Sequence, residues 1–241
     1  MKGLILAAGL GTRLRPLTDR IPKPLIEVNG KPMLEYVVLK MKDAGIDDII
    51  INTHHLGEKI QQFVYAKNSF GIKIRISHEP TLLDTGGAIV NCKEYLSDKE
   101  PFVVYNSDIY SDFPLIDFIA NHLKAQNEIT LLASRRKTSR YLLFAQNGRM
   151  QGWTKADGSE TRPHNIVIDG LERKAFGGVH VINSSVLDKL EKYSEGRGKV
   201  FSITDFYIDN CMNVDIGFFE PPSDYFWYDI GKLDILEKLK S

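Results

Sequence analysis

The sequence has few cysteines and no excess of charge of one sign, and both absences exclude classes of function. Among 241 residues there are two cysteines, Cys92 and Cys211, which lie far apart and lack the spacing of zinc or redox pairs. Unpaired cysteines are typical of a reducing compartment, so we expect a cytoplasmic protein. Basic and acidic residues are balanced at 31 each, without a long run of one sign. This balance argues against nucleic acid or a membrane surface as the main partner.

Long hydrophobic runs are also missing. No apolar stretch approaches the length needed to span a membrane. The apolar N-terminus is faintly like a secretory signal, but residues 9–15 interrupt it with turn-forming and charged residues, so a buried strand explains it better. No repeat, low-complexity segment or linker occurs. We therefore expect a single domain over residues 1–241, with one part at roughly 1–135 and a second at roughly 136–230.

Strand-like and helix-like segments alternate in the first half of the chain. Helices of about ten residues between short apolar strands imply right-handed crossovers and a doubly wound, mainly parallel α/β sheet. In such a sheet, ligands bind at the carboxyl ends of the strands. The expected strands are 3–8, 48–52, 72–77, 102–105 and 129–133, and the expected helices are 33–44, 58–67, 87–95 and 115–125.

The second half is less regular and predicts a smaller, mixed or antiparallel region. Its expected strands are 141–145, 148–153, 175–182 and 214–219, and its expected helices are 184–193, 202–212 and 232–240.

A glycine-rich turn follows the first expected strand. Gly9 and Gly11 allow a tight turn whose backbone N–H groups can face anionic oxygens, and Arg13 adds a planar charged fork that matches phosphate. A Walker loop is absent. A dinucleotide fingerprint would need a third glycine at Leu14 and an acidic residue after the second strand, where residues 52–54 are Asn-Thr-His. A purely structural turn between strand and helix remains the alternative.

Residues 9–24 carry a longer pattern, Gly-x-Gly-Thr-Arg-x-x-Pro-x-Thr followed by Pro-Lys-Pro. It resembles, residue for residue, the signature of the sugar-1-phosphate nucleotidylyltransferases. The resemblance implies a Rossmann-like nucleotide-diphospho-sugar transferase fold, with nucleotide bound by the first part and sugar by the smaller mixed lobe. It implies catalytic roles for Arg13 and Lys23. The nucleotide-binding positions that it implies here are Leu6, Ala7, Ala8, Gly9, Gly11 and Thr12.

Two distant aspartates are the candidate metal ligands. Asp108 follows the expected strand at 102–105, and Asp229 lies in residues 227–231, which resemble the family's Trp-x-Asp-x-Gly motif. In the family these aspartates hold the catalytic metal, so the resemblance implies Mg²⁺ at Asp108 and Asp229. Carboxylates combined with substrate phosphates form a usual magnesium site. Without the resemblance, Asp108 is a turn or capping residue and Asp229 a helix N-cap.

The loop at residues 78–88 resembles the family's base-reading segment. The resemblance places Glu79, Thr85 and Gly86 against the nucleobase. A carboxylate only accepts hydrogen bonds, so Glu79 would favour a base with an imide or amide N–H, such as uracil or guanine. The alternative is a long loop that caps the following helix.

The sugar-phosphate side is less clearly marked. Asn106 follows the fourth strand, and residues 175–180 resemble the turn whose glycines, here Gly178, lie beside the sugar; a simple β-bulge is the alternative. The family's Glu-Lys-Pro element, whose lysine binds the sugar phosphate, is missing. We expect Lys155 to replace that lysine, with Arg162 as the second option.

The resemblance implies transfer of a nucleotidyl group from a nucleoside triphosphate to a sugar 1-phosphate, giving a nucleotide sugar and pyrophosphate. Element lengths and the 84–87 loop favour UTP with N-acetylmuramate 1-phosphate. The alternatives are GTP with mannose or heptose 1-phosphate, or a catalytically silent nucleotide-sugar-binding regulatory protein. The partners are thus small molecules, and both a monomer and a homodimer remain open.

Overall fold

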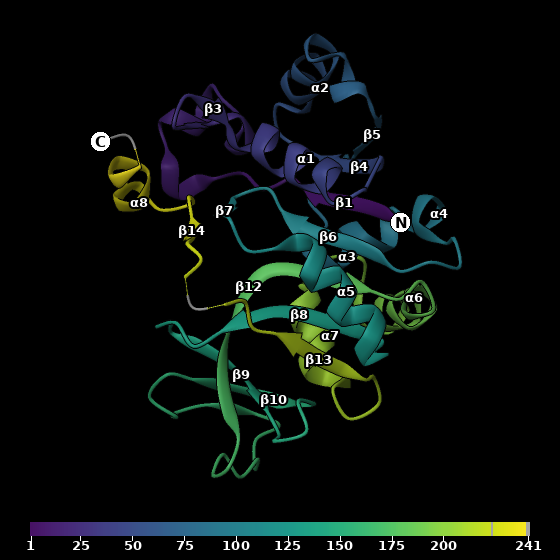
Figure 1. Cartoon of the computed structure of the whole chain (residues 1–241), viewed down its shortest axis with the longest axis vertical. Helices are drawn as coiled ribbons and strands as arrows, with labels where there is room; N and C mark the ends of the chain where they lie inside the picture. Colours follow the sequence, from purple (N-terminus) through teal and green to yellow (C-terminus); the bar gives the residue numbers. More distant parts are fainter. Residues whose placement is uncertain (223, 240–241) are drawn as a thin grey trace.

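One large mixed sheet forms the centre of the molecule. The computed structural model describes residues 1–222 and 224–239, and Figure 1 shows their arrangement. Within these residues the large sheet has the order β11-β10-β9-β12-β6-β1-β4-β5, and β8 joins it by pairing with β12 and β13. Its strands are β1 (Lys2–Leu6), β4 (Asp48–Thr53), β5 (Lys73–His78), β6 (Phe102–Asn106), β8 (Ile129–Ser134), β9 (Arg140–Phe144), β10 (Met150–Lys155), β11 (Thr161–Arg162), β12 (Glu172–Ile182) and β13 (Ile216–Phe219).

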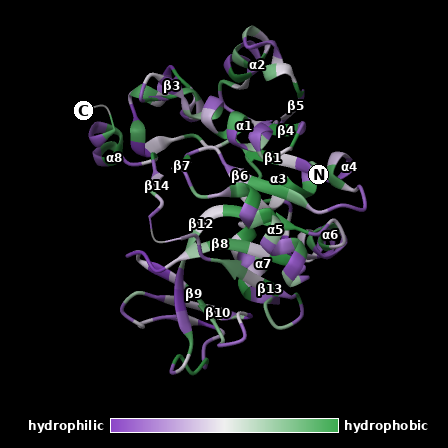
Figure 2. Ribbon diagram, viewed as in Figure 1, coloured by the Kyte–Doolittle hydropathy of each residue, from purple (hydrophilic) through white to green (hydrophobic). Residues whose placement is uncertain are grey.

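The parallel part of the sheet is β5-β4-β1-β6. Strand β1 pairs in parallel with both β4 and β6, and β4 pairs in parallel with β5. Neighbouring β1 residues Leu4 and Ile5 are both fully buried, in core clusters on opposite faces of the sheet. A strand buried on both faces reads as a continuous apolar run, which explains why the sequence marks β1, β4 and β6 clearly, whereas the edge strand β5 alternates polar and apolar residues and is only partly buried. Figure 2 shows the hydrophobic colour along β6.

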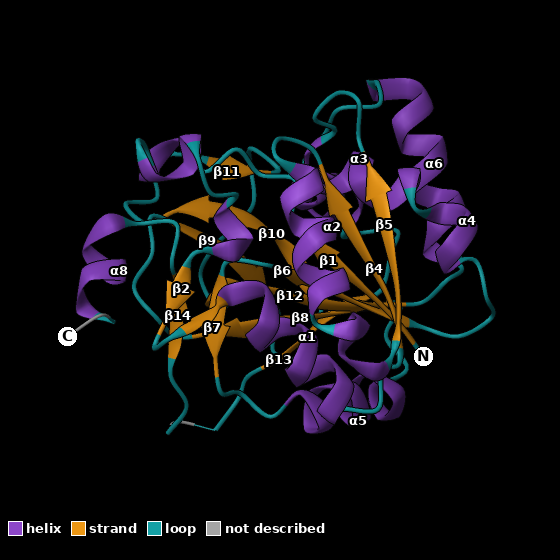
Figure 3. Ribbon diagram, turned by 90° about the horizontal axis from the view of Figure 1, so that it is seen from above, coloured by secondary structure: helices purple, strands orange, loops and turns teal. Residues whose placement is uncertain are grey.

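Helices cover both faces of the sheet, as a doubly wound fold requires (Figure 3). One core cluster contains apolar residues of α1, α2 and α5, and the other contains residues of α3, α4, α6 and α7. The helices are α1 (Met33–Asp43), α2 (Gly57–Ala66), α3 (Asp84–Asn91), α4 (Lys93–Leu96), α5 (Leu115–Ala125), α6 (Val186–Arg197), α7 (Ile203–Asn210) and α8 (Leu233–Lys238).

Strand β12 connects the parallel part to the antiparallel part. It runs antiparallel to β6, β8 and β9, and β10 continues the antiparallel order to β11. In Figure 1 the β9 and β10 region lies at the end of the molecule opposite α2. The core cluster that contains Leu4 also contains Leu142 and Phe144, so apolar packing continues across residue 135. The division of roles between residues 1–135 and 136–230 stays a prediction.

The C-terminal segment returns to the N-terminal loop. Strand β14 (Trp227–Asp229) pairs antiparallel with β7 (Ile109–Ser111), and β2 (Glu27–Val28) pairs with β3 (Lys31–Pro32). A third core cluster joins Ile230 and Leu236 to Leu14 and Met33. Figure 1 shows α8 beside the β3 hairpin. This packing brings Asp229 to Arg13 of the glycine-rich turn, which lies far earlier in the chain.

The expected α/β fold class is confirmed, and the differences are local. The helix expected at 87–95 is two helices, α3 and α4, that meet at Cys92. The last helix begins at Leu233, and Asp229 lies in β14, so Asp229 is not its N-cap; residue 240 of the expected helix lies outside the described residues. The short strands β2, β3, β7, β11 and β14 were not predicted, since two- and three-residue strands carry no periodic signal.

Candidate active site

Two cavities meet at the carboxyl ends of the parallel strands. One, of about 760 Å³, lies over β1, β4, β5 and β6, and the other, of about 430 Å³, lies between β6, β12 and β14. Asn106 and Asp108 line both cavities, so these residues stand at their junction. The larger cavity is lined by Leu6, Ala8, Gly9, Thr12, Arg13, Lys23, Pro24, Asn52, Glu79, Leu82, Asp84, Thr85, Asn106, Ser107, Asp108 and Val200.

The glycine-rich turn is built as the sequence requires. Gly11 has φ +62°, and a Cβ there would lie 2.8 Å from Thr18 Cγ2, so conformation and space both select glycine. Its carbonyl accepts hydrogen bonds from Leu14 N and Thr18 Oγ1. Gly9 lines the larger cavity, and a Cβ there would meet no atom within 4 Å. The turn therefore leaves open room at Gly9 and holds Arg13 at the cavity wall.

Four charged side chains converge beside Gly231. A Cβ on Gly231 would lie 2.6 Å from Lys23 Nζ, 2.8 Å from Arg13 Nη2 and 2.8 Å from Asp229 Oδ1. Lys23 also forms an ion pair with Asp108, whose carbonyl accepts a hydrogen bond from Ile230 N at 3.0 Å. The structure thus brings the two cations and the two aspartates that the sequence singled out to one point.

Asp108 and Asp229 fit a divalent cation. The β7–β14 pairing sets Asp229 opposite Ile109, next to Asp108, and both aspartates line the smaller cavity. Across residues 1–222 and 224–239 no group of three or more His, Cys, Asp or Glu side chains could hold a metal. Magnesium commonly binds one or two carboxylates together with substrate phosphates and water. The pair has the composition of such a site, and the missing side chain at Gly231 lets the four charged groups approach one another.

Glu79 lies at the floor of the larger cavity but is bonded to the protein. Its carboxylate is fully buried and accepts hydrogen bonds from Asn52 Nδ2 at 2.8 Å and from Leu83 N at 3.1 Å. Asn52 Oδ1 accepts from Ala7 N at 2.6 Å. The N–H of Ala7 and the Glu79 carboxylate are therefore both engaged within the protein, where the sequence predicted contacts to nucleotide.

Gly86 packs against the protein as well. Its N–H donates to Phe201 O at 2.9 Å, and a Cβ on Gly86 would lie 2.2 Å from the Phe201 ring. Thr85 Oγ1 accepts a hydrogen bond from Ile203 N at 2.9 Å. The loop of residues 199–201 thus explains this glycine, and it brings the exposed side chain of Val200 to the larger cavity.

The smaller cavity has a basic wall. It is lined by Asn106, Asp108, Ile109, Arg136, Lys137, Thr138, Ser139, Phe176, Gly178, Trp227, Asp229 and Lys232.

Gly178 and Arg136 shape this smaller cavity. A Cβ on Gly178, which has φ +76°, would lie 3.0 Å from Asn106 Nδ2, so glycine is required there. The Arg136 guanidinium carbon lies 3.5 Å from the centre of the Trp227 ring. Burial lowers the pKa of Arg136 from its ordinary value, while Tyr225, Asp229 and Tyr141 raise it.

Lys155 and Arg162 lie outside the lining of both cavities. Lys155 is about half exposed and pairs with Glu160 at 2.7 Å. Arg162 donates to Asp205 at 2.7 Å and to Asp209 at 2.6 Å, which ties β11 to α7. The structure therefore does not place either side chain where the sequence expected a replacement for the missing lysine.

Most of the predicted residues line the cavities, and several that line them were missed. Ala7, Gly11 and Gly86, by contrast, do not line the larger cavity. Sequence reasoning gave no role to Arg136, Lys232 or Val200, because isolated residues in loops carry no motif. Asn52 had a usable signal, since it lies at the carboxyl end of a parallel strand, the edge where ligands bind.

Known proteins resemble this chain over most of its length. The family model described as nucleotidyl transferase matches residues 2–241. A mannose-1-phosphate guanyltransferase of Gibberella zeae is 35% identical over 195 residues, which are 79% of this chain and 52% of that protein. The mannose-1-phosphate guanylyltransferase catalytic subunit beta of Dictyostelium discoideum is 30% identical over 239 residues, 96% of this chain and 61% of that protein. The chain thus spans about half to three fifths of these curated relatives.

Solved structures share the fold at low sequence identity. HddC from Yersinia pseudotuberculosis, complexed with GMP-PN, has a TM-score of 0.73 and 22% identity, covering 99% of this chain and 97% of that one. A UDP-glucose pyrophosphorylase complexed with UDP-glucose has a TM-score of 0.77 and 18% identity, covering 99% and 96%. These likenesses show the shared fold, and the family match over residues 2–241 shows that the chain belongs to the nucleotidyl transferase family.

Proposed function

We propose that this protein transfers a nucleotidyl group from a nucleoside triphosphate to a sugar 1-phosphate, releasing pyrophosphate. The observation that carries the proposal is the convergence of Arg13, Lys23, Asp108 and Asp229 where the two cavities meet. The larger cavity takes the nucleotide and the smaller one takes the sugar phosphate. A reaction between the two substrates then occurs at their shared wall, where the charged groups lie.

The mechanism rests on positioning and charge. The phosphate of the sugar is already anionic at neutral pH, so its oxygen attacks the α-phosphorus without a general base, and pyrophosphate leaves from the opposite side. Arg13 and Lys23 hold the phosphate oxygens of the triphosphate and offset the charge that develops on them. Fixing the two substrates in adjoining cavities removes much of the entropic barrier.

Asp108 and Asp229 would hold Mg²⁺ in this site. A bound divalent cation supplies Lewis-acid neutralisation of phosphate charge and orients the phosphates. In the structure Asp108 forms an ion pair with Lys23, which lies beside the same site.

The curated relatives favour GTP and mannose 1-phosphate over the UTP and N-acetylmuramate 1-phosphate that we expected from the sequence. Both relatives described above are named as mannose-1-phosphate guanylyltransferases. We therefore propose GTP with mannose 1-phosphate as the first pair to test. We also propose a cytoplasmic location, which the buried, free side chains of Cys92 and Cys211 support. In the described residues no helix is both long and apolar enough to cross a membrane.

A pyrophosphate-release assay tests the proposal. GTP, UTP, dTTP, ATP and CTP are each combined with mannose, glucose and N-acetylmuramate 1-phosphates, with and without Mg²⁺. We expect the highest kcat/KM for GTP with mannose 1-phosphate and no release after chelation of divalent cations. Release with a different pair would correct the substrates alone. No release with any pair would overturn the proposal in favour of a silent regulatory protein.

A further inference from the structure

We propose that Arg136, stacked on Trp227, binds the phosphate of the sugar 1-phosphate in the smaller cavity. The proposal rests on the proposed function, because it assigns a residue to the acceptor side of that reaction. It also replaces Lys155 and Arg162, the two residues that the sequence suggested for this role.

The guanidinium of Arg136 is held in one orientation. Its central carbon lies 3.5 Å from the centre of the Trp227 ring, and Nη2 donates a hydrogen bond to the carbonyl of Phe176. Trp227 is itself fixed, because its Nε1 donates to Gly177 O at 2.9 Å and its strand pairs with β7. Stacking and a single backbone acceptor therefore pre-organise the plane of the guanidinium at the cavity wall.

The guanidinium of Arg136 has N–H donors that form no hydrogen bond within the protein. A guanidinium has five N–H groups, and the Phe176 carbonyl takes one of them. Nε is buried and has no hydrogen-bond partner. A buried donor without a partner is costly, so an arginine held in this way calls for a functional explanation. Phosphate oxygens accept parallel N–H bonds from such a fork, and phosphate is the anionic group that the proposed acceptor carries.

The other cations near the cavity are less suited to the role. Lys137 and Lys232 line the same cavity, but their side chains are exposed. Lys155 is neutralised by Glu160, and Arg162 by Asp205 and Asp209. In residues 1–222 and 224–239, Arg136 is the lining cation of the smaller cavity that is both partly buried and fixed by stacking.

Steady-state kinetics with each substrate varied in turn test the assignment. We expect Arg136→Met to raise the KM for mannose 1-phosphate about 10- to 100-fold, with the KM for GTP changed less than about twofold. Arg136→Lys keeps the charge but loses the fork, so we expect it to restore only part of the loss. The matched control is Arg135→Met, because Arg135 is 74% exposed on its side chain and pairs with Glu172 at the surface.

Two kinetic results would overturn the assignment. One is an unchanged KM for the sugar 1-phosphate in Arg136→Met. The other is an equal rise of both KM values in Arg136→Met, which would indicate a structural role. If the KM for the sugar 1-phosphate rises in Lys155→Met but not in Arg136→Met, Lys155 is the residue that binds the phosphate.

A binding measurement separates this inference from the proposed function. The chain has two tryptophans, Trp153 and Trp227, so the tryptophan fluorescence of a Trp153→Phe variant reports on Trp227 alone. We expect mannose 1-phosphate and inorganic phosphate to change this emission saturably, and mannose not to. When Arg136→Met is combined with Trp153→Phe, the dissociation constants of both mannose 1-phosphate and inorganic phosphate should rise at least tenfold. Equal binding with and without Arg136 would overturn the assignment, whereas a wild-type protein that binds but does not turn over would overturn only the proposed function.

Discussion

The side-chain amide of Asn52 donates a hydrogen bond to the carboxylate of Glu79 at 2.8 Å. The same side chain accepts one from Ala7 N at 2.6 Å, and Glu79 also accepts one from Leu83 N at 3.1 Å. These bonds join the ends of β1, β4 and β5 to the loop before α3. Asn52 and Glu79 are both buried, so the pair sets the floor of the larger cavity. A carboxylate that the sequence predicts to contact the nucleobase thus holds the wall against which a base would lie.

We expect Glu79→Gln to destabilise the fold. The glutamine amide can accept only one of the two hydrogen bonds, and its NH₂ group would face the donor that is left. An unsatisfied buried donor costs about 1–3 kcal/mol, so the free energy of unfolding should fall by that amount in urea denaturation.

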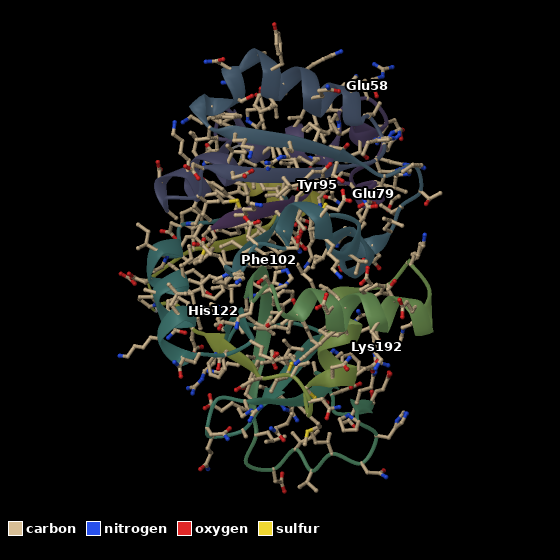
Figure 4. The ribbon with its side chains drawn as sticks, turned by 90° about the vertical axis from the view of Figure 1, so that its right-hand side faces the viewer. Glu58, Glu79, Tyr95, Phe102, His122 and Lys192 are labelled. Carbon is tan, nitrogen blue, oxygen red and sulfur yellow. The ribbon has the colours of Figure 1, made fainter. Side chains whose placement is uncertain are left out.

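Glu58→Gln is the matched control for this change. Glu58 is exposed on α2, and Figure 4 shows it apart from Glu79. Its replacement should change the free energy of unfolding by less than about 0.5 kcal/mol. If Glu79→Gln keeps full stability but raises the KM for the nucleotide, Glu79 contacts the base directly and the supporting role is wrong.

Gly231→Ala should remove activity without unfolding the protein. The added methyl would lie 2.6–2.8 Å from Lys23 Nζ, Arg13 Nη2 and Asp229 Oδ1. These atoms are the ends of flexible side chains, so they move apart and the fold survives. Displacement by about 1 Å in a positioned site costs about 100-fold, and kcat should fall by at least that factor.

The control for Gly231→Ala is Gly196→Ala on α6. A Cβ on Gly196 meets no atom within 4 Å, and alanine favours a helix over glycine. This variant should keep its kcat and gain up to about 1 kcal/mol in stability. Near-normal turnover in Gly231→Ala would show that the convergence of charges is not the reaction centre.

Asp108→Asn should abolish turnover while the fold is retained. The change keeps the size of the side chain but removes the charge that pairs with Lys23 and would hold a divalent cation. We expect kcat to fall at least about 1000-fold in the pyrophosphate-release assay, with the circular dichroism spectrum unchanged. Asp188→Asn, which breaks only a surface pair with Lys93, should retain full activity. Activity within tenfold of wild type in Asp108→Asn would exclude the proposed role.

The fold was predictable where one segment carries its own signal. The inner parallel strands β1, β4 and β6 have buried apolar residues on both faces, so Leu4 and Ile5 mark β1 without help from the rest of the chain. The turn at Gly11 was also predictable, because a positive φ favours glycine whatever the rest of the chain does. The aspartates at 108 and 229 could be paired only through resemblance to a family, since the β7–β14 contact that joins them spans more than a hundred residues.

The sugar side could not be predicted because its contacts are distant and carry no motif. Arg136 gains its orientation from Trp227, in a strand of three residues. Gly86 stands out in the sequence as part of a turn pattern. The structure shows that glycine is needed there because the ring of Phe201 packs against it, and the turn pattern does not predict this contact. Lys155 and Arg162 had the expected charge, whereas the acidic partners that neutralise them are evident only in the folded chain.

Acid should destabilise the protein through His180. This residue lies near the C-terminal end of β12, fully buried, where Nδ1 contacts the hydroxyl of Tyr207 and Nε2 has no partner. Burial lowers the pKa of His180 to about 3, whereas the unfolded chain binds the proton near 6.5. Protons therefore bind the unfolded state preferentially, and the stability present above pH 6.5 is lost as the pH falls toward 3. The loss is about 1.4 kcal/mol per pH unit, or about 2 kcal/mol between pH 7 and pH 5.

Urea denaturation between pH 7 and pH 5 measures this loss. His180→Leu should be less stable at pH 7, because the Tyr207 hydroxyl loses its partner, but its stability should fall by about 2 kcal/mol less than that of wild type over the same range. His122, whose pKa burial also lowers, leaves a residual slope of the same sign in both proteins. His55→Leu, at an exposed position, should follow the wild-type curve. Parallel curves for wild type and His180→Leu would mean that His180 takes up its proton in the folded state, which requires that the core around β12 admits a charge.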